Sequence, residues 1–328
     1  NMGEVPFPGE TNLAELLLQV RQEDLLKASI DTTQAVQLAD TVVVVVPVIV
    51  DETAKPDFSA IDSATRDIAG GLKQNTLICY ETTLPIGTTR NRFGPLLQEI
   101  SGLDYETDFY LAYSPERVFS GRIFADLRTY PKLVGGINDQ STQRAITFYE
   151  SVLDFDDRPD LDQPNGVWNL GKSEAAEMAK LIETTYRNVN IALANEFAIH
   201  AEELSIDIGN VIQASNSQPF SHIHNPGVAV GGHCIPVYPK FYLSTHENAS
   251  LPQAAISVNE SMPIRAVEQL KRSFGNDVAK KRVAILGAAY RGGVKETAFS
   301  GVFSLVTQIA NNGWDPLVHD PLYNDTEL

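Results

Sequence analysis

Apolar residues recur along the first half of the chain in short runs that alternate with helical spacing. A nearly unbroken β-branched run covers residues 40–50, which is typical of a parallel strand buried on both faces. Pro47 cannot donate to a central ladder, so this strand is expected to stop at Val46. Helices are expected over residues 13–26 and 58–72, and further strands over residues 76–80, 109–112 and 132–134. This alternation predicts an open parallel sheet whose ligands bind at the carboxyl ends of its strands, in loops after Val46, Tyr80 and Tyr113.

The second half opens with one long helical stretch. Residues 173–204 contain neither Pro nor Gly, which predicts a helix about 45 Å long. Such a helix is longer than one sheet layer can cover, so we expect it to join two domains and to pair with its copy in a homodimer. A helix is also expected over residues 252–274, and residues 282–287 begin a second strand-turn-helix unit. The predicted fold class is α/β, with two dinucleotide-binding-type parallel sheets joined by a long central helix and domains over residues 1–172, 173–274 and 275–328.

Composition narrows the class of protein. The chain has 328 residues, 43% of them hydrophobic, and a net charge of −17. So acidic a surface repels nucleic acid and anionic membranes, and neither is expected as a partner. We expect no membrane span and no leader, because no apolar run approaches the roughly 20 residues that a span needs. Two distant cysteines, Cys79 and Cys234, fit a reducing compartment, so the expected localisation is cytoplasmic.

A glycine-rich loop carries the most specific chemistry. Residues 227–236 read GVAVGGHCIP, with glycines at positions 227, 231 and 232 and a cysteine at position 234. These glycines allow positive φ and leave backbone N–H groups free to approach an anion. A thiolate next to an oxyanion-binding loop suits covalent catalysis, because it adds readily to a carbonyl carbon. The flanking residues favour this interpretation over a buried structural cysteine.

Five blocks in order resemble the UDP-glucose/GDP-mannose dehydrogenase family. They are residues 82–89 (TTLPIGTT), residues 113–118 (YSPERV), the helix from Lys180 to Ala194-Asn195-Glu196, the Cys234 loop, and residues 286–291 (LGAAYR). The resemblance implies an enzyme that oxidises the C6 alcohol of a nucleotide sugar to a carboxylate with two NAD. Ser114-Pro115-Glu116-Arg117-Val118 followed by Gly121 is similar to the branch that acts on UDP-N-acetylhexosamines such as UDP-N-acetylmannosamine.

The resemblance also implies roles for individual residues. Cys234 matches the nucleophile, Lys180 the lysine that stabilises oxyanions, Thr83 a residue that holds the hydrolytic water, and Glu116 a carboxylate that relays protons near it. Thr184 takes a catalytic position as well. The residues expected to bind NAD are Val46, Pro47, Thr83 and Glu116. Those expected to bind the UDP-sugar are Arg117, Arg187, His222, His224, Asn225, Gly227, Gly231, Gly232, Arg291 and Lys295.

Several positions depart from the family pattern. Thr184 stands where the family usually has asparagine, and Tyr238 where aspartate follows the cysteine by four. An arginine of the last block corresponds to Ala298, a loss for which Arg291 and Lys295 can compensate. The chain opens at residues 1–6 (NMGEVP), which resemble a segment downstream of the family's first strand and Gly-x-Gly-x-x-Gly turn. We expect that this turn is omitted from the sequence at hand.

Three alternatives remain. His222, His224, His233 and Cys234 are suitable zinc ligands, although their spacing is unconventional and we expect no metal. Thr184 and Tyr238 are also compatible with a nucleotide-sugar-binding homologue with weak or no turnover. The third alternative keeps the enzyme and changes the substrate to UDP-glucose or GDP-mannose.

Overall fold

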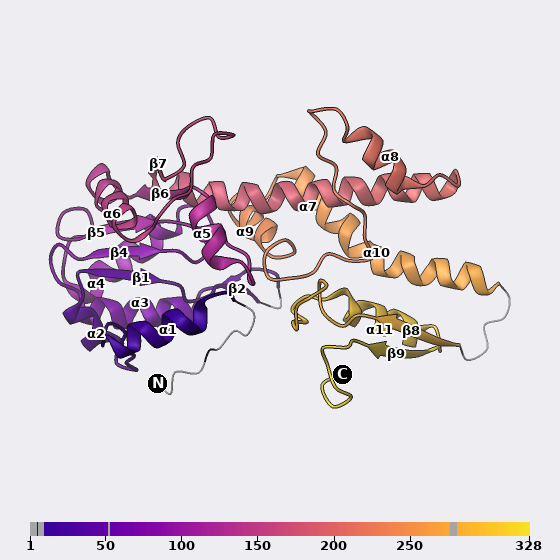
Figure 1. The fold of residues 1–328 in the computed structure, drawn as a ribbon, viewed down its shortest axis with the longest axis horizontal. Coiled ribbons are helices and arrows are strands. Elements are labelled where there is room, and N and C mark those ends of the chain that lie inside the picture. The colour runs from indigo at the N-terminus through magenta and orange to yellow at the C-terminus, as the bar shows by residue number, and fades with distance from the viewer. Residues whose placement is uncertain (1–4, 6–9, 52, 276–280) are drawn as a thin grey trace. The chain divides into compact units, whose positions relative to one another are not determined.

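The computed structural model describes residues 5, 10–51, 53–275 and 281–328, and the chain divides into two compact units, residues 1–180 and 181–328 (Figure 1). Of residues 1–6, on which the expected omission of the glycine turn depends, only Val5 belongs to the described part. In the part of the chain that the structure describes, no helix combines the length and apolar character needed to cross a bilayer.

The first unit is an α/β layer structure that ends within the long helix α7. Its helices are α1 (Leu13–Gln22), α2 (Thr32–Leu38), α3 (Ser59–Gly71), the π-helical turn η1 (Thr89–Phe93), α4 (Gly94–Ser101), α5 (Ile123–Thr129), α6 (Asp139–Val152) and the start of α7 (Ser173–Glu203). Its strands are β1 (Thr41–Val44), β2 (Ile49–Val50), β3 (Pro56–Asp57), β4 (Leu77–Tyr80), β5 (Tyr110–Tyr113), β6 (Lys132–Gly136) and β7 (Val167–Lys172).

Five of these strands form one sheet in the order β1-β4-β5-β6-β7. The first three run parallel, as expected, and β6 runs antiparallel to β5, which the alternation of helices and strands did not predict. β7 is parallel to β6. The amino end of β6 therefore lies beside the carboxyl ends of β1, β4 and β5, and this end of the strands is called the edge of the sheet. β2 and β3 form a separate antiparallel pair.

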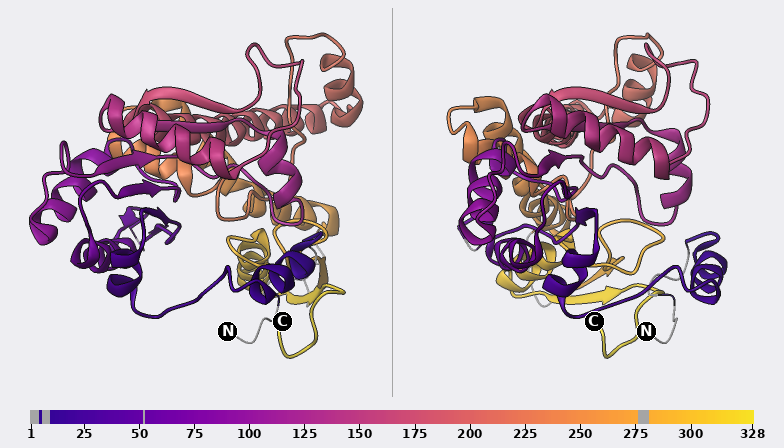
Figure 2. Two further views of the ribbon diagram at one scale, coloured as in Figure 1. Left: turned by 60° about the vertical axis from the view of Figure 1, so that its left-hand side comes forward. Right: turned by 90° about the vertical axis from the view of Figure 1, so that its left-hand side faces the viewer.

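Side chains of β4 alternate between two apolar layers. Leu77 and Cys79 point into a core shared with Ala145 and Tyr149 of α6. On the opposite face, the Tyr80 ring stacks on Phe93 at a centroid distance of 4.2 Å. The four residues of β4 are fully buried, because helices cover both faces of the sheet (Figures 1 and 2).

The second unit contains the rest of α7 and a smaller sheet. Its elements are α8 (Ile208–Ser215), α9 (Tyr238–Thr245), α10 (Ser250–Phe274), β8 (Arg282–Leu286), α11 (Gly301–Asn311) and β9 (Asp315–His319). β8 and β9 pair in parallel, as expected for the start of a second dinucleotide-binding-type sheet. Val267 of α10, Ile309 of α11 and Trp314 form the buried core beside them.

Most expected elements are present with shifted ends. The helix expected over residues 173–204 is α7, which is continuous from Ser173 to Glu203 in every view (Figures 1 and 2). The first strand ends at Val44, two residues earlier than expected, because its pairing with β4 stops there. Likewise α1 ends at Gln22.

Candidate active site

The loops that follow β4 and β5 lie side by side at one edge of the first sheet. The register places Tyr80 beside Tyr113, and the backbone N–H of Glu116 donates to the carbonyl of Glu81 at 3.3 Å. This contact brings two acidic side chains to the same place.

The loop after β1 joins this edge. The hydroxyl of Thr82 donates to the carbonyl oxygen of Val46 at 2.7 Å. Thr83 is buried, and Pro47 is exposed. The four residues expected to bind NAD, namely Val46, Pro47, Thr83 and Glu116, are therefore all found in loops at the carboxyl ends of the parallel strands.

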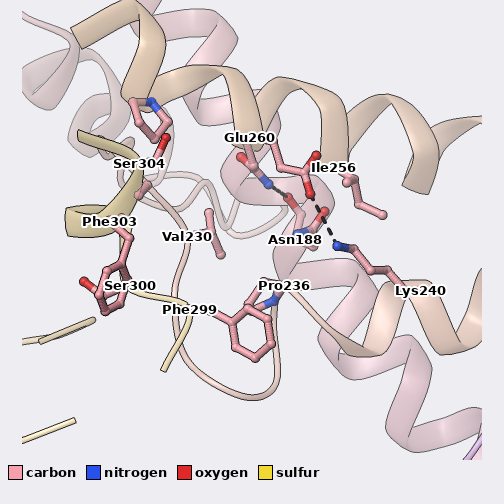
Figure 3. Close-up of a pocket in the computed structure, with 14 residues that line it drawn as sticks. Asn188, Val230, Pro236, Lys240, Ile256, Glu260, Phe299, Ser300, Phe303 and Ser304 are labelled. Atoms are coloured by element: carbon pink, nitrogen blue, oxygen red, sulfur yellow. Dashed lines mark hydrogen bonds and ion pairs between the residues drawn. The ribbon is translucent and has the colours of Figure 1, made fainter. Parts of the chain in front are cut away.

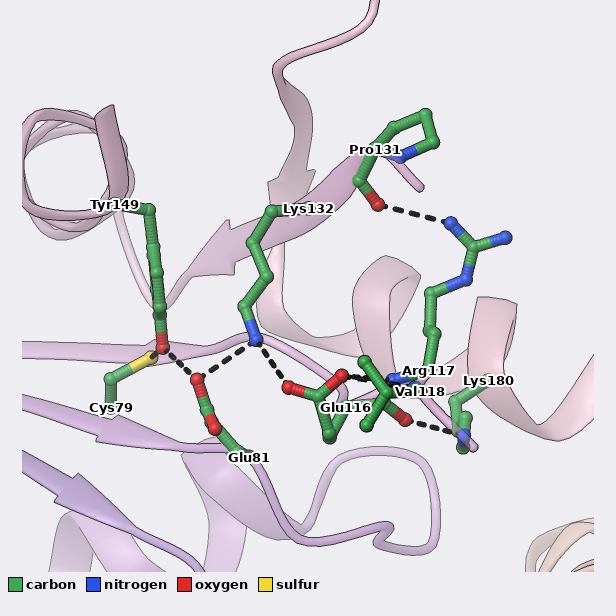
Figure 4. A network of polar contacts seen from close by, with 9 residues as sticks. All are labelled: Cys79, Glu81, Glu116, Arg117, Val118, Pro131, Lys132, Tyr149 and Lys180. Atoms are coloured by element: carbon green, nitrogen blue, oxygen red, sulfur yellow. Dashed lines mark hydrogen bonds and ion pairs between the residues drawn. The ribbon is translucent and has the colours of Figure 1, made fainter. Parts of the chain in front are cut away.

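A buried lysine joins the two acidic side chains (Figure 4). Lys132 Nζ lies 2.9 Å from Glu81 Oε1 and 3.2 Å from Glu116 Oε2, and the side chain of Lys132 is only 6% exposed. Burial on its own lowers the pKa of Lys132, but the charges of Glu81 and Glu116 outweigh that effect and raise it. The two carboxylates therefore favour the charged form of Lys132.

The network continues behind Lys132 into the core. The Tyr149 hydroxyl donates to Glu81 Oε1 at 2.6 Å and contacts Cys79 Sγ at 3.2 Å. Burial raises the pKa of the Tyr149 hydroxyl well above its ordinary value and that of the Cys79 thiol to about 12. Cys79 is thus a neutral core thiol.

Lys180 approaches the same acidic residue from α7. Its Nζ donates to the backbone carbonyl of Glu116 at 2.5 Å (Figure 4). The carboxylate of Glu116 accepts from the N–H groups of Arg117 (2.6 Å) and Val118 (3.1 Å). The first unit therefore brings together two of the expected catalytic residues, Lys180 and Glu116.

One further carboxylate on α7 supports the loop that contains Thr83. Glu177, which is fully buried, accepts from the N–H of Gly87 (2.5 Å) and from both the N–H (2.8 Å) and the hydroxyl (2.7 Å) of Thr89. Burial raises the pKa of Glu177 to about 7 in spite of these hydrogen bonds. Glu177 lies three residues before Lys180, so the same stretch of α7 contacts the loops after β4 and β5.

In the second unit, Cys234 lies in the turn that leads into α9. Its carbonyl accepts from the N–H of Val237 (3.2 Å) and Tyr238 (2.9 Å), and its thiol is free and partly exposed. The N-terminal end of a helix favours a nearby negative charge, such as a thiolate. Tyr238, the departure four residues after the cysteine, is the first residue of α9.

The two glycines before Cys234 pack against the last family block. A Cβ on Gly231 would lie 2.6 Å from Tyr290 Cβ and 2.8 Å from the carbonyl oxygen of Phe299. Gly232 has φ +88°, and a Cβ there would lie 2.9 Å from the Tyr290 ring. Side chains are excluded at both positions, so the glycines are required for this close approach.

Asparagines of α7 hold the loop at several points. Asn195 Oδ1 accepts from the N–H of Gly227 (2.9 Å), and Asn190 Oδ1 from that of His224 (2.8 Å). Asn188 Nδ2 donates to the carbonyl of Ile235 (3.2 Å), directly after the cysteine. Our sequence reasoning assigned no role to these three residues. Asparagine is unfavourable inside a helix, so its recurrence at positions 188, 190 and 195 was the available signal.

The other expected catalytic and substrate residues lie in both units. Arg117 donates to the carbonyl of Pro131 at 3.0 Å in the first unit. The Thr184 hydroxyl, in the second unit, donates to the carbonyl of Leu181 at 3.1 Å and is buried. Lys295 Nζ pairs with Glu327 at 2.6 Å, and Arg291 Nε lies 3.5 Å from the Tyr290 hydroxyl.

The remaining residues expected to bind the substrate lie in residues 222–225, before the loop glycines, or near this segment. His222 and Asn225 are exposed, and the carbonyl of His222 accepts from Asn190 Nδ2 at 2.7 Å. Burial and the positive charge of Arg187 lower the pKa of His224. Arg187 on α7 therefore lies near the loop.

A pocket of about 400 Å³ adjoins the loop in the second unit (Figure 3). Val230, Pro236 and Phe299 supply apolar walls, and Lys240 pairs with Glu260 at 3.4 Å. Within the described ranges, no three His, Cys, Asp or Glu side chains are grouped as metal ligands. His233 pairs instead with Glu296.

Comparisons with known proteins identify relatives of this chain. Residues 1–153 match the NAD binding domain of the UDP-glucose/GDP-mannose dehydrogenase family, and residues 174–262 match its central domain. The UDP-N-acetyl-D-mannosamine dehydrogenase of Pyrococcus horikoshii is 35% identical over 83% of this chain and 63% of its own length. That of Campylobacter jejuni is 30% identical over 95% of this chain and 75% of its own length. The solved structure of the Pyrococcus horikoshii UDP-D-ManNAc dehydrogenase has a TM-score of 0.86 and 32% identity, covering 95% of this chain and 72% of the other.

The residues of the first unit fit the cofactor that its matched domain implies. Val45 exposes 67% of its surface directly after β1, which suits contact with the flat rings of NAD. The carboxylates of Glu81 and Glu116 are engaged by Lys132, so their charges are partly compensated at the carboxyl ends of the parallel strands, where an anionic dinucleotide would bind. The chain spans 63% of the length of the first two curated relatives that it matches. The matched domains, the similar solved structure and the cysteine loop together show that this chain belongs to the UDP-glucose/GDP-mannose dehydrogenase family.

Proposed function

We propose that the protein oxidises the C6 alcohol of a UDP-N-acetylhexosamine, UDP-N-acetylmannosamine foremost, to the uronate in two steps. The observation that carries this proposal is the position of Cys234, a free thiol between a tightly packed glycine loop and the start of α9. The names of the relatives from Pyrococcus horikoshii and Campylobacter jejuni support the choice of sugar.

In this proposal, Cys234 forms the covalent bond to the substrate. NAD, when bound, accepts the hydride released in each of the two oxidations. Between them, the Cys234 thiolate adds to the C6 aldehyde to form the alkoxide of a thiohemiacetal, and loss of the second hydride from this alkoxide leaves a thioester. Water then adds to the thioester carbonyl carbon, the C–S bond breaks, and the thiolate is released with the uronate.

Residues of the first unit supply the charges that these steps require. Lys180 stabilises the oxyanion, since an ammonium in a low-dielectric pocket favours developing negative charge. Glu116 takes the proton from the attacking water, which Thr83 orients. The hydrogen bond from Lys180 to the backbone of Glu116 supports a shared site for these two residues.

We also propose the assembly and the substrate contacts. The proposed domains cover residues 1–172, 173–274 and 275–328. The residues that bind the UDP-sugar are the loop glycines and Arg117, Arg187, His222, His224, Asn225, Arg291 and Lys295.

The proposed homodimer forms by pairing of α7 with its copy. Four apolar side chains of α7 are exposed, namely Ile182, Tyr186, Leu193 and Phe197. They fall within an arc of about 60° at 100° per residue, which supports this pairing. Two unpaired thiols suit the cytoplasm.

One observation favours weaker turnover as the second candidate. The Thr184 hydroxyl is buried and bonded within its own helix, where the family usually supplies an asparagine carboxamide. A nucleotide-sugar-binding homologue with weak or no turnover is consistent with this arrangement.

The deciding experiment counts NADH per sugar. The full-length protein is incubated with NAD and limiting UDP-N-acetylmannosamine, UDP-N-acetylglucosamine, UDP-glucose or GDP-mannose. Two NADH per UDP-N-acetylmannosamine, with the highest kcat/KM for that sugar, is the expected result. Tight binding without NADH supports the second candidate, and a higher kcat/KM for UDP-glucose or GDP-mannose contradicts the choice of sugar.

Two variants test the covalent route. Cys234→Ser should abolish acid formation while it still binds the nucleotide sugar. Lys180→Ala should lower kcat about 10²–10³-fold and change sugar binding much less, as expected for a group that acts on the transition state. Unchanged acid formation by Cys234→Ser would rule out the thioester.

A further inference from the structure

Strand direction alone places Lys132 opposite Glu116. β5 and β6 pair antiparallel with Ala112 opposite Gly136 and Tyr113 opposite Gly135. Continued three residues beyond Tyr113, this register sets Glu116 against Lys132. A parallel β6 would have placed Lys132 at the other edge of the sheet.

Two carboxylates and an aromatic ring surround the buried ammonium of Lys132. Its Nζ reaches both carboxylates, Glu81 at 2.9 Å and Glu116 at 3.2 Å, and lies 4.8 Å from the centre of the Tyr149 ring. Tyr149 in turn donates to Glu81, which is 13% exposed in its side chain. Two carboxylates and an aromatic face therefore contact the same buried ammonium.

We propose that Lys132 is a positioning residue for Glu116 in the hydrolysis step, an inference that rests on the proposed function. Lys132 holds Glu116 Oε2, while the N–H groups of Arg117 and Val118 hold Oε1. The orientation of the carboxylate is thereby set from both sides. Glu81 and Tyr149 act through Lys132, because their contacts keep its ammonium in place.

Positioning matters because Glu116 has two tasks at once. Its carboxylate takes the proton from the water that attacks the thioester, and its backbone carbonyl holds Lys180 Nζ at 2.5 Å. A displaced carboxylate slows proton transfer, and a misplacement of about 1 Å is sufficient to cost on the order of 10²-fold in rate. The first two chemical steps, which need no proton transfer to Glu116 from water, should be less affected.

The test compares Lys132→Met with Lys132→Arg in the full-length enzyme. We expect Lys132→Met to lower kcat about 10- to 100-fold while KM for UDP-N-acetylmannosamine changes less than about 3-fold. Since hydrolysis becomes limiting, this variant should release a burst of two NADH per site, and mass spectrometry should find the uronyl group on the peptide that contains Cys234. Lys132→Arg keeps the positive charge and should recover most of kcat. Lys73→Met, at a solvent-exposed pair with Asp40, is the matched control and should behave as the unaltered protein.

A second variant separates positioning from folding. Lys132→Met leaves Glu81 without its cation, so Lys132→Met combined with Glu81→Gln removes that buried charge and should fold while it keeps the burst. A folded single or double variant with normal kcat, or one that loses kcat without a burst, overturns the role of Lys132. If instead the unaltered protein fails to produce two NADH per sugar, the proposed function fails first, and the two failures are distinguishable.

Discussion

The side-chain oxygen of Asn195 on α7 accepts the backbone N–H of Gly227 at 2.9 Å, which attaches the first glycine of the cysteine loop to the helix. The amide nitrogen of Asn195 donates to Asn259 on α10, also at 2.9 Å, and Asn195 is fully buried. One carboxamide therefore connects α7 both to the cysteine loop, at the exposed Gly227, and to the buried Asn259 of α10.

Replacing this carboxamide should destabilise the protein. Asn195→Ala leaves the buried Oδ1 of Asn259 and the less buried N–H of Gly227 without this partner, so we expect the free energy of unfolding to fall by about 1–3 kcal/mol. Urea denaturation measures the loss. Asn210→Ala, which removes only an exposed bond to Asp207, should cost less than about 0.5 kcal/mol and is the control. Equal losses in the two variants would contradict the role of Asn195.

A methyl group on the second glycine of the loop should disturb the position of Cys234, the proposed nucleophile. Gly231→Ala places a Cβ 2.6 Å from Tyr290 Cβ, so the loop must shift, at a cost of about 1–3 kcal/mol. We expect kcat/KM to fall at least about 10-fold, since Cys234 lies three residues away. Gly292→Ala, with open space around its Cβ, is the matched control for stability, and an unchanged Gly231→Ala enzyme would refute the close packing.

The two cysteines should differ sharply in reactivity. Cys79 is fully buried, and burial raises the pKa of its thiol to about 12, so little thiolate forms at pH 8. Cys234 is partly exposed. Iodoacetamide should therefore modify one thiol in the folded protein and two in denaturant, and Cys234→Ser should leave none that reacts in the folded state. Rapid labelling of Cys79 in the native protein would be inconsistent with its burial.

Glu177 should make stability depend on pH. Burial raises the pKa of its carboxyl from 4.5 to about 7, so the native state holds this proton more tightly than the unfolded chain. The resulting stabilisation is complete below about pH 4.5 and is lost as the pH rises through 7. The stability of the unaltered protein relative to Glu177→Gln should fall by about 2–3 kcal/mol between pH 5 and 7.5. Urea unfolding across this range tests the slope, with Glu99→Gln on the exposed part of α4 as the control. A flat or rising difference would count against the shift.

The apolar stripe of α7 should support self-association. Phe197→Glu introduces a charge among Ile182, Tyr186 and Leu193, which are 49%, 53% and 43% exposed. If this stripe pairs with its copy, burying an unpaired charge should weaken the dimer by at least about 3 kcal/mol. Size-exclusion chromatography with light scattering reports the molecular mass. Leu38→Glu, at an exposed position of α2, should leave the mass unchanged, and the same result for Phe197→Glu would exclude this interface.

Much of the fold and part of the site could be predicted from local patterns. The helix over residues 173–204 was predicted almost to the residue, because a stretch without Pro or Gly and with a polar face has few alternatives. The β-branched run around Val44 and the apolar β4 both form strands. β4 is fully buried, but β1 stands at the end of the strand order and Val43 is 38% exposed, so the expected burial of this strand on both faces is wrong. The Cys234 loop was recognisable because its three glycines lie within six residues of each other in the sequence, and Gly231 and Gly232 pack closely on Tyr290.

Only the tertiary structure decided which distant side chains meet. The direction of β6 depends on non-local pairing with β5, and no pattern within residues 132–136 encodes it. That direction brings Lys132 to Glu81 and Glu116, 51 and 16 residues away in sequence, and converts an ordinary strand lysine into a buried cation. The partners of Asn195 and Glu177 were also decided by the tertiary structure, because each residue satisfies backbone groups of a loop that packs on α7. Local propensity determined the elements, and the free energy of packing them determined the partners of each polar side chain.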